Sequence, residues 1–199
     1  MTTQVKPSPV SLFTNELCLF YLRIEDYEHA YQTAGFILND DPRNRTALYV
    51  LGAVYEVRDN LPMALQHYDA ILNNYPQDAK AMKRKAYVEM HLHMELEALQ
   101  HINISIELDK NDAESYLIRG MIYFYYFAKK LDAIVDYNEA LRLDPQNVMA
   151  LFNRGYAYLK YGNKNYAHDD FSQAAELGYG YAGEMLDRYF ASKQFSTAS

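Results

Sequence analysis

The stretch Leu151–Gly178, "LFNRGYAYLKYGNKNYAHDDFSQAAELG", decides the fold because its pattern occurs four more times upstream in the chain. Its alanine position recurs at spacings of 34, 34, 35 and 34 residues, at Ala30, Ala64, Ala98, Ala133 and Ala167. A fixed period of this length is typical of proteins built from stacked repeats. The 199-residue chain therefore contains five copies of one short unit.

Four further positions follow the same period. The small position holds Cys18, Gly52, Ala86, Gly120 and Gly155. The tyrosine position holds Tyr21, Tyr55, Glu89, Tyr123 and Tyr158. The apolar position holds Ala34, Tyr68, Ile102, Tyr137 and Phe171. The proline position holds Pro42, Pro76, Lys110, Pro145 and Tyr179. Agreement of five positions over five copies is not a chance pattern.

These positions resemble the tetratricopeptide repeat, and the fifth copy carries the family pattern almost intact. The resemblance implies an all-α solenoid, a right-handed superhelix in which each copy is a pair of antiparallel helices. We place the copies at 11–44, 45–78, 79–112, 113–147 and 148–181, within a single domain over 11–195. The third copy diverges most, and the fourth has one extra residue between Gly120 and Ala133.

The physical chemistry of the positions agrees with this architecture. Small residues let two helix backbones approach closely, while tyrosine and apolar residues fill the space around them. Prolines stand where a second helix has ended, because proline cannot continue a helix. In "DNLPMALQHY", Asn60 is expected to cap a helix whose first turn accepts Pro62.

Different structures are expected at the two ends of the chain. Residues 1–10 contain two prolines and no long apolar segment, so they are expected to form a disordered arm. After the fifth copy, Met185, Leu186, Tyr189 and Phe190 fall on one helical stripe. A solenoid must cover its last apolar face, so we expect a capping helix at about 180–194.

Bulk composition narrows the function classes. A net charge of −7 and a pI near 5.3 argue against a general nucleic-acid binder or a binder of anionic membranes. The single cysteine allows no internal disulfide framework and favours a reducing, cytoplasmic setting. Since Cys18 occupies the small position, it is expected to be a buried, unreactive thiol.

Five consecutive aromatic residues, Tyr123–Phe127, raise three possibilities: a membrane span, a stacking platform or ordinary core. The apolar run from Met121 to Ala128 has only eight residues, far fewer than the ~18 of a spanning helix. Tyr123 belongs to the tyrosine position. Phe124 to Phe127 either pack between the third, fourth and fifth copies or line a binding or dimer surface.

No catalytic or metal-binding constellation is apparent. Glycine-rich phosphate loops, nucleophile elbows and HExxH motifs are absent from the sequence. His91 and His93 point apart on a helix and have only Glu95 as a nearby acid, which is weak evidence for zinc. His67 and His101 share a repeat position that continues as a polar stripe. Each carboxylate is expected at a helix end or on an outer face, so we expect no enzyme activity, no metal and no cofactor.

In the resembled family, the first helices of successive repeats line a concave groove that holds a peptide or helix. Carried over by position, the groove residues are Leu12, Asn15, Glu16, Leu19, Thr46, Tyr49, Val50, Ala53, Lys80, Lys83, Arg84, Tyr87, Glu114, Leu117, Ile118, Met121, Met149, Phe152, Asn153 and Tyr156. The expected peptide-binding set within them is Tyr49, Val50, Lys80, Lys83, Arg84, Tyr87, Leu117, Ile118, Met121, Phe152, Asn153 and Tyr156. It combines an apolar floor, which favours burial of partner side chains, with a basic cluster.

The basic cluster consists of Lys80, Lys83 and Arg84. Lys80 and Arg84 are four apart on a helix, so both can reach one anion, or they can pair with acids of the first two copies. One class of the family grips acidic C-terminal tails of heat-shock chaperones with a five-residue carboxylate clamp. Lys80 and Arg84 match its last two positions, but Asn15, Leu19 and Val50 do not match the first three. The expectation that remains is that an acidic side chain or a C-terminal carboxylate docks at Lys80 and Arg84.

The sequence therefore predicts a non-enzymatic protein-interaction module, an adaptor, scaffold or assembly factor with chaperone-like character. Its expected partner is a peptide segment or helix of apolar and acidic character, not a nucleic acid or an inserted membrane. Two alternatives stay open: a self-associating homo-oligomer, and a dedicated secretion chaperone, which rests on analogy alone.

Overall fold

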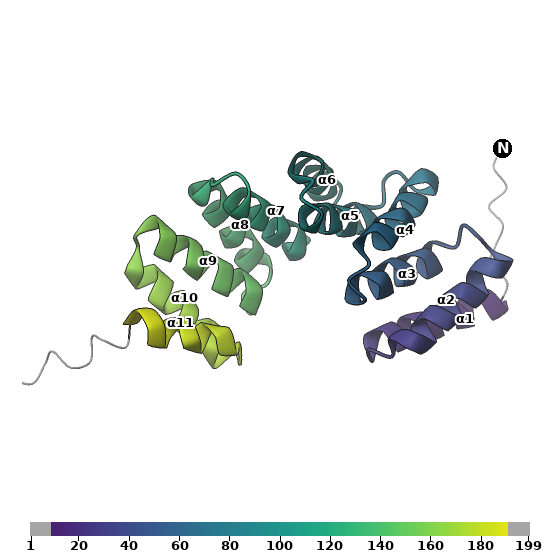
Figure 1. Ribbon diagram of the computed structural model, residues 1–199, viewed down its shortest axis with the longest axis horizontal. Helices are drawn as coiled ribbons and strands as arrows, with labels where there is room; N and C mark the ends of the chain where they lie inside the picture. The colour runs from purple at the N-terminus through teal and green to yellow at the C-terminus, as the bar shows by residue number, and fades with distance from the viewer. Residues whose placement is uncertain (1–8, 191–199) are drawn as a thin grey trace, which may run out of the picture. The chain divides into compact units, whose positions relative to one another are not determined.

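The computed structural model describes residues 9–190, and over this range it is entirely helical, with short turns and no strand (Figure 1). The helices are α1 (Pro9–Arg23), α2 (Tyr27–Asp40), α3 (Arg45–Val57), α4 (Leu61–Asn74), α5 (Ala79–His91), α6 (Glu95–Leu108), α7 (Ala113–Tyr125), α8 (Lys130–Leu143), α9 (Val148–Tyr161), α10 (Lys164–Glu176) and α11 (Gly180–Phe190). The all-α solenoid prediction is confirmed at the level of successive packed helix pairs. The chain divides into two compact units, an N-terminal unit of residues 1–108 and a C-terminal unit of residues 109–199.

The N-terminal unit contains three helix pairs, α1–α2, α3–α4 and α5–α6, and each pair also packs on the next. Short polar side chains begin α2, α3, α4 and α5, because a capping oxygen satisfies an N–H group that has no partner within the helix. Asn60 accepts a hydrogen bond from the Met63 N–H and Pro62 lies in the first turn of α4, which confirms the predicted cap. Asp78 caps α5 in the same way by accepting from the Ala81 N–H at 3.0 Å.

The C-terminal unit contains the pairs α7–α8 and α9–α10, followed by α11, which packs on α10. Met185, Leu186 and Phe190 of α11 pack against the core of this unit, while Tyr189 is 40% exposed. The helix thus covers an apolar face of α10 with the stripe that the sequence indicated. Residues 191–194 of the expected capping helix and residues 1–8 of the expected arm lie outside the described residues.

The small and apolar positions of one copy are fitted to each other. A Cβ atom on Gly52 would lie 2.7 Å from Cε1 of Tyr68, and one on Gly120 would lie 2.5 Å from Cε1 of Tyr137. Both rings are fully buried, so glycine is required where the partner helix presents an aromatic ring. In the third copy the same two positions hold a larger and a smaller residue, Ala86 and Ile102, both also fully buried. In the second, third and fourth copies a larger residue at one position is thus matched by a smaller residue at the other.

A residue with left-handed backbone lies in the turn after the first helix of every copy, and the five positions repeat with the period of the sequence: Glu25, Asp59, His93, Ala128 and Gly162. The next N–H bonds back to the carbonyl of the tyrosine position, for example from Asn60 to Tyr55 at 2.8 Å. In the fourth copy this bond runs from Lys129 to Tyr123 at 2.9 Å and encloses one more residue. The extra residue of the fourth copy is therefore accommodated in the turn after α7, and both helices keep their length.

Candidate functional site

The residues expected to line the groove differ in accessibility. In the N-terminal unit, Lys80 is exposed and Tyr49, Arg84 and Tyr87 are partly exposed, whereas Val50 and Lys83 are buried. In the C-terminal unit the partly exposed members are Met121, Phe152 and Tyr156, and the buried members are Leu117, Ile118 and Asn153.

The assignment of Val50, Leu117 and Ile118 to an accessible floor needs correction, because their side chains are 0%, 8% and 2% exposed. Val50 shows the reason. Its helix α3 packs on α2, α4 and also α1, so only a narrow stripe of α3 reaches the surface. Val50 accordingly belongs to the core cluster that α1, α2 and α3 share.

The predicted basic cluster is divided among different partners. Arg84 binds Glu56 through two nitrogens, with Nε donating to Oε1 at 3.0 Å and Nη2 donating to Oε2. The Tyr68 hydroxyl donates to the same carboxylate at 2.5 Å. Glu56 belongs to the second copy. Arg84 is therefore paired with an acid of a preceding copy, which was one of the two possibilities that the sequence left open. Lys80 takes a separate place, with its ammonium nitrogen 3.9 Å from the ring centre of Tyr49.

A hollow of about 190 Å³ lies on the first-helix side of the N-terminal unit, and we call it the anchor pocket. It is lined by Leu19, Arg45, Thr46, Tyr49, Ile71, Asp78 and Lys80, from α1, α3, α4 and the start of α5. Leu19, Thr46, Tyr49 and Lys80 were expected in the groove, and the structure brings these four together. Three of the lining residues were not predicted from the sequence: Arg45, Ile71 and Asp78. Of these, Asp78 carried a signal, because an aspartate is typical of the residue that begins a helix.

The polar wall of the anchor pocket is an ion pair. The Nε atom of Arg45 donates to the Asp78 carboxylate, whose side chain is 4% exposed and also caps α5. This hydrogen bond is the main cause that raises the pKa of Arg45. A larger, open hollow of about 650 Å³ lies next to the anchor pocket and shares Arg45 and Asp78 with it. Its other lining residues, Tyr75, Pro76 and Gln77, form the loop between α4 and α5.

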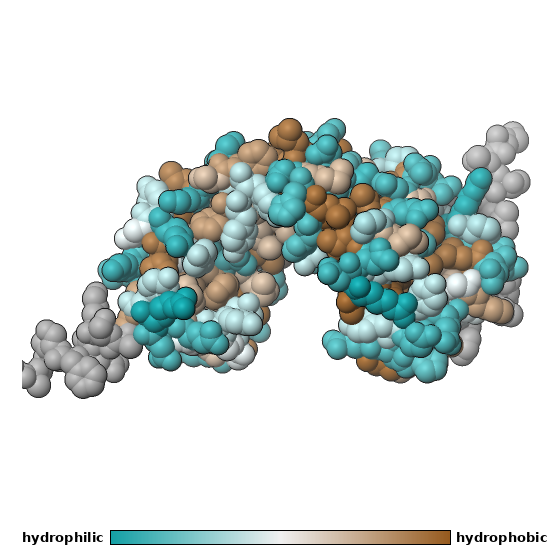
Figure 2. All heavy atoms as spheres, in the orientation of Figure 1, coloured by the Kyte–Doolittle hydropathy of each residue, from teal (hydrophilic) through white to brown (hydrophobic). Residues whose placement is uncertain are grey.

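The first-helix side of the C-terminal unit is aromatic. Phe152 lies edge-to-face with Tyr179, with ring centres 5.1 Å apart, and Phe124 lies edge-to-face with Tyr156 at 5.7 Å. Tyr125 is 51% exposed and donates its hydroxyl hydrogen to Asn153 Oδ1 at 3.2 Å. Part of the aromatic run is therefore packing inside this unit, and Tyr125 is its most exposed member. On the face drawn in Figure 2, apolar surface within each unit is interrupted by hydrophilic side chains.

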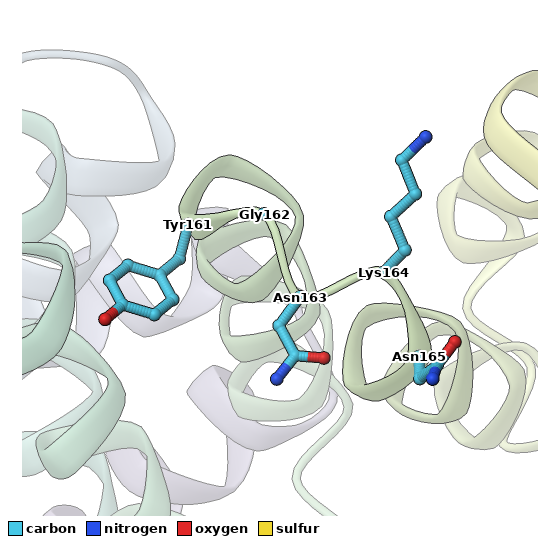
Figure 3. A pocket seen from close by; sticks show the side chains of 5 residues that line it. All are labelled: Tyr161, Gly162, Asn163, Lys164 and Asn165. Atoms are coloured by element: carbon cyan, nitrogen blue, oxygen red, sulfur yellow. The ribbon is translucent and has the colours of Figure 1, made fainter.

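A further hollow of about 470 Å³ lies at the turn between α9 and α10. Figure 3 shows that its side chains diverge, with Tyr161 pointing to one side and Lys164 to the other. Gly162 in this turn has a φ of 101°, which explains glycine there. Because no polar groups converge, this hollow is a weaker candidate than the anchor pocket.

Buried carboxylates correct a second expectation, that every acid lies at a helix end or on an outer face. Glu89, Asp136 and Asp170 are 2%, 3% and 5% exposed. Asp136 and Asp170 accept two hydrogen bonds each, from Arg119 and Arg154 respectively. Burial raises the pKa of both carboxyls.

In the third copy, a buried carboxylate is paired with a histidine and a lysine in place of an arginine. Glu89, in the tyrosine position, lies 2.7 Å from His101 Nδ1 and 3.8 Å from the Lys85 ammonium. These charges are engaged in holding helix pairs together and are not arranged for general acid or base catalysis.

Residues 9–190 contain neither a cluster of metal ligands nor a helix suited to cross a membrane. No three His, Cys, Asp or Glu side chains of this range are grouped so that they could hold a metal ion. No helix of this range combines the length and apolarity that crossing a membrane requires. Cys18 is fully buried, as predicted, and its thiol lies 3.6 Å from the Ala30 carbonyl oxygen.

Comparison with known proteins agrees with the geometry. A family model for the TPR repeat matches residues 132–162. Tetratricopeptide repeat protein 6 of Homo sapiens is 26% identical over 140 residues, which are 70% of this chain and 26% of that protein. The DnaJ homolog subfamily C member 7 homolog of Dictyostelium discoideum is 25% identical over 172 residues, 78% of this chain and 32% of that protein. The chain is thus similar to tetratricopeptide repeat proteins. It spans about a third or less of the length of these two relatives.

Solved structures share this fold at low sequence identity. The structure titled "Functional Characterization of Pseudomonas Aeruginosa pilF" superposes with a TM-score of 0.76 at 16% identity, covering 91% of this chain and 92% of that one. YrrB, described as a TPR protein with an unusual peptide-binding site, superposes with a TM-score of 0.64 at 20% identity, covering 87% and 90%. The tetratricopeptide repeat assignment thus rests on both the repeat pattern and the architecture.

Proposed function

We propose that this tetratricopeptide repeat chain is a non-catalytic interaction module, an adaptor or assembly factor, that binds a segment of another protein. The observation that carries the proposal is the anchor pocket. Three successive repeats contribute to it, and its lining combines apolar side chains with a few polar groups, as in most ligand sites of proteins. The binding face is formed by the accessible groove residues of the N-terminal unit, chiefly Leu19, Thr46, Tyr49 and Lys80.

Two comparisons support an interaction role. YrrB is described as having a peptide-binding site, and the Dictyostelium relative is named as a DnaJ homolog. Both are tied to this chain by fold or partial sequence similarity, so the role of partner binding carries over only as a proposal. We place the activity in the cytoplasm because the single cysteine is a buried thiol that needs no oxidising compartment.

Affinity capture from the source cell tests the proposal when three forms of the chain are compared. Lys80→Glu reverses the charge beside the anchor pocket, and Lys164→Glu makes the same change at an exposed lysine of α10. A partner that is captured by the unmodified chain and by Lys164→Glu, but lost with Lys80→Glu, supports the proposed face. Equal capture by all three forms places binding elsewhere. Arg84 is left unchanged, because its removal would leave Glu56 buried without its cation.

Self-association is the competing use of the same surfaces, with Tyr125 as the most exposed residue of the aromatic run. Sedimentation velocity at two concentrations a hundredfold apart distinguishes self-association from binding of a different partner. A constant monomer mass is expected for a partner-binding module. A mass that rises with concentration, and that Tyr125→Ser lowers, would favour the self-associating alternative.

A further inference from the structure

The first helix of the N-terminal unit has an apolar face that is open to solvent. Leu17, Phe20 and Ile24 lie at i, i+3 and i+7, which places them on one stripe of α1 and the residue after it. The N–H group of Ile24 still bonds to the Phe20 carbonyl at 3.1 Å, so the helical path continues to this residue. Leu17 is partly exposed, and Phe20 and Ile24 are 48% and 52% exposed. We call these three residues the edge face.

The repeat positions of the edge face are covered in later copies. Leu17 corresponds to Leu51, which is 7% exposed. Phe20 is the exposed member of a position whose four other residues are fully buried: Val54, Val88, Ile122 and Ala157. An end of a stacked-repeat array that faces only water normally carries polar residues. The first copy instead has the apolar composition of a covered interface.

In the second copy the cover is the preceding second helix. Ala34 and Ile37 of α2 lie in one core cluster with Leu51 and Val54 of α3. The helices α4 and α5, α8 and α9, and α10 and α11 pack in the same order. Within the described residues α1 is the first helix, and its packing on α2 and α3 leaves the edge face open. The edge face is therefore a repeat-to-repeat interface without its second helix.

The existing interfaces also indicate the direction and the charge of a helix that would fit. The Lys130 ammonium, at the start of α8, donates to the Lys160 carbonyl oxygen near the end of α9 at 3.0 Å. A second helix thus runs antiparallel to the first helix that it covers. The position of Lys160 in α9 corresponds to Arg23, the exposed last residue of α1. A helix on the edge face would begin beside Arg23, where an acidic first turn suits both the guanidinium and the helix dipole.

We propose that the edge face docks an amphipathic helix of a partner protein, in the place that a preceding second helix would take. The partner helix has an acidic first turn and apolar residues at i, i+3 and i+4, the spacing with which Ala34, Ile37 and Leu38 of α2 meet their core cluster. This interface is separate from the anchor pocket and goes beyond the proposed function. A second copy of the chain is a poorer occupant, because α2, α4, α8 and α10 each already pack on the first helix that follows them.

A peptide copy of a second helix serves as the probe. It has the sequence of residues 26–40 with acetylated and amidated ends, and Gly35→Ala raises its helix propensity. Asp26 and Glu28 supply the acidic start. A second peptide with Ile37→Asp should not bind, because it places a charge on the apolar stripe. A third with Glu28→Lys should bind about two- to fivefold more weakly, as expected for an exposed ion pair.

Binding is followed by ¹⁵N NMR titration of the intact chain. The result expected is saturable shifts of the Leu17, Phe20 and Ile24 amides, with the amides of Thr46 and Tyr49 at the anchor pocket unchanged. The first peptide should produce these shifts, and the Ile37→Asp peptide should not.

Two variants of the chain locate the binding face. Phe20→Ser removes about half a phenylalanine side chain of coverable surface and should weaken binding about tenfold. The matched control is Phe36→Ser, which makes the same change on α2 at a 67% exposed side chain and should leave binding unchanged. The residues at the Phe36 position of the later copies are not buried either: Ala70, Ile104, Glu139 and Gln173. The urea midpoints of both variants verify that the chain stays folded.

The inference is overturned if the first peptide leaves the edge-face amides unshifted, or if the Ile37→Asp peptide binds equally well. It is also overturned if Phe20→Ser and Phe36→Ser have the same effect. A sedimentation mass that rises with concentration, and that Phe20→Ser returns to the monomer, would make a second copy the occupant and would overturn it too. Capture of a partner that depends on Lys80 is a separate result, so the proposed function stands or fails independently.

Discussion

Gly120 offers the sharpest test of how the repeats are packed. A Cβ atom at this position would lie 2.5 Å from Cε1 and 2.8 Å from Cδ1 of Tyr137, against 3.4 Å or more in ordinary contacts. Tyr137 is fully buried, so its ring has no space into which it could move. Gly120→Ala should therefore force a rearrangement of α7 against α8.

The magnitude follows from two opposing effects. Overpacking of a core by one methyl group costs about 1–3 kcal/mol, and a contact of this closeness belongs at the upper end. Alanine is a better helix former than glycine by about 1 kcal/mol. The free energy of unfolding should thus fall by about 2 kcal/mol in the natural chain.

The third copy supplies the compensating background, because it pairs Ala86 with Ile102 at the same two positions. In a Tyr137→Ile chain, Gly120→Ala should be neutral or should raise the free energy of unfolding by up to about 1 kcal/mol. The coupling between the two positions is then about 2–3 kcal/mol, in the upper part of the range for residues in contact.

Urea unfolding of the four chains, followed by circular dichroism and by the fluorescence of the 20 tyrosines, measures this coupling. Gly35→Ala is the control, since a Cβ atom at this helical glycine meets no atom within 4 Å and should stabilise the chain by about 1 kcal/mol. Equal effects of Gly120→Ala in both backgrounds would refute the packing argument.

Three further predictions concern single features. Ala128 has a φ of 54° and Gly162 a φ of 101° at the same repeat position, so Ala128→Gly should raise, and Gly162→Ala lower, the free energy of unfolding by about 1 kcal/mol in urea titrations. Tyr68→Phe removes a hydrogen bond to a carboxylate and should cost about 2 kcal/mol. Tyr137→Phe should cost nothing, because the Tyr137 hydroxyl is buried without a hydrogen-bond partner among the described residues; equal costs would contradict this. Burial raises the pKa of the Cys18 thiol from 9.0 to about 12, so reaction with a disulfide reagent at pH 8 should be about a thousandfold slower in the native than in the unfolded chain; similar rates would show that the thiol is accessible.

The repeat positions were sufficient to predict the architecture, and the reason is visible in the residues. Each position imposes one packing requirement, such as a small residue beneath the side chain of the facing helix, and all five copies meet it. The left-handed turn residues follow the same period but differ in type, from Glu25 to Gly162, so residue identity alone gave little sign of them.

The candidate site was less predictable. A repeat position tells which residues are equivalent, but it does not tell where a long side chain ends. Arg84 reaches Glu56, 28 residues earlier, and this pairing engages one of the two cations that were expected to meet a partner carboxylate. Val50 occupies an equivalent groove position but is covered by core contacts. Arg45 and Asp78 meet across 33 residues at the pocket wall, which no local pattern in the sequence marks.

The most direct test of the interaction function is site-specific photo-crosslinking in the source cell. A benzoylphenylalanine in place of Tyr49 puts the reactive group at the anchor pocket, and one in place of Gln66 puts it at an exposed site of α4. We predict adducts with a small set of proteins from position 49, lost when Thr46→Phe fills the pocket, and none of these from position 66. The same adducts from both positions, or none from position 49, would contradict the proposal that this face binds a partner.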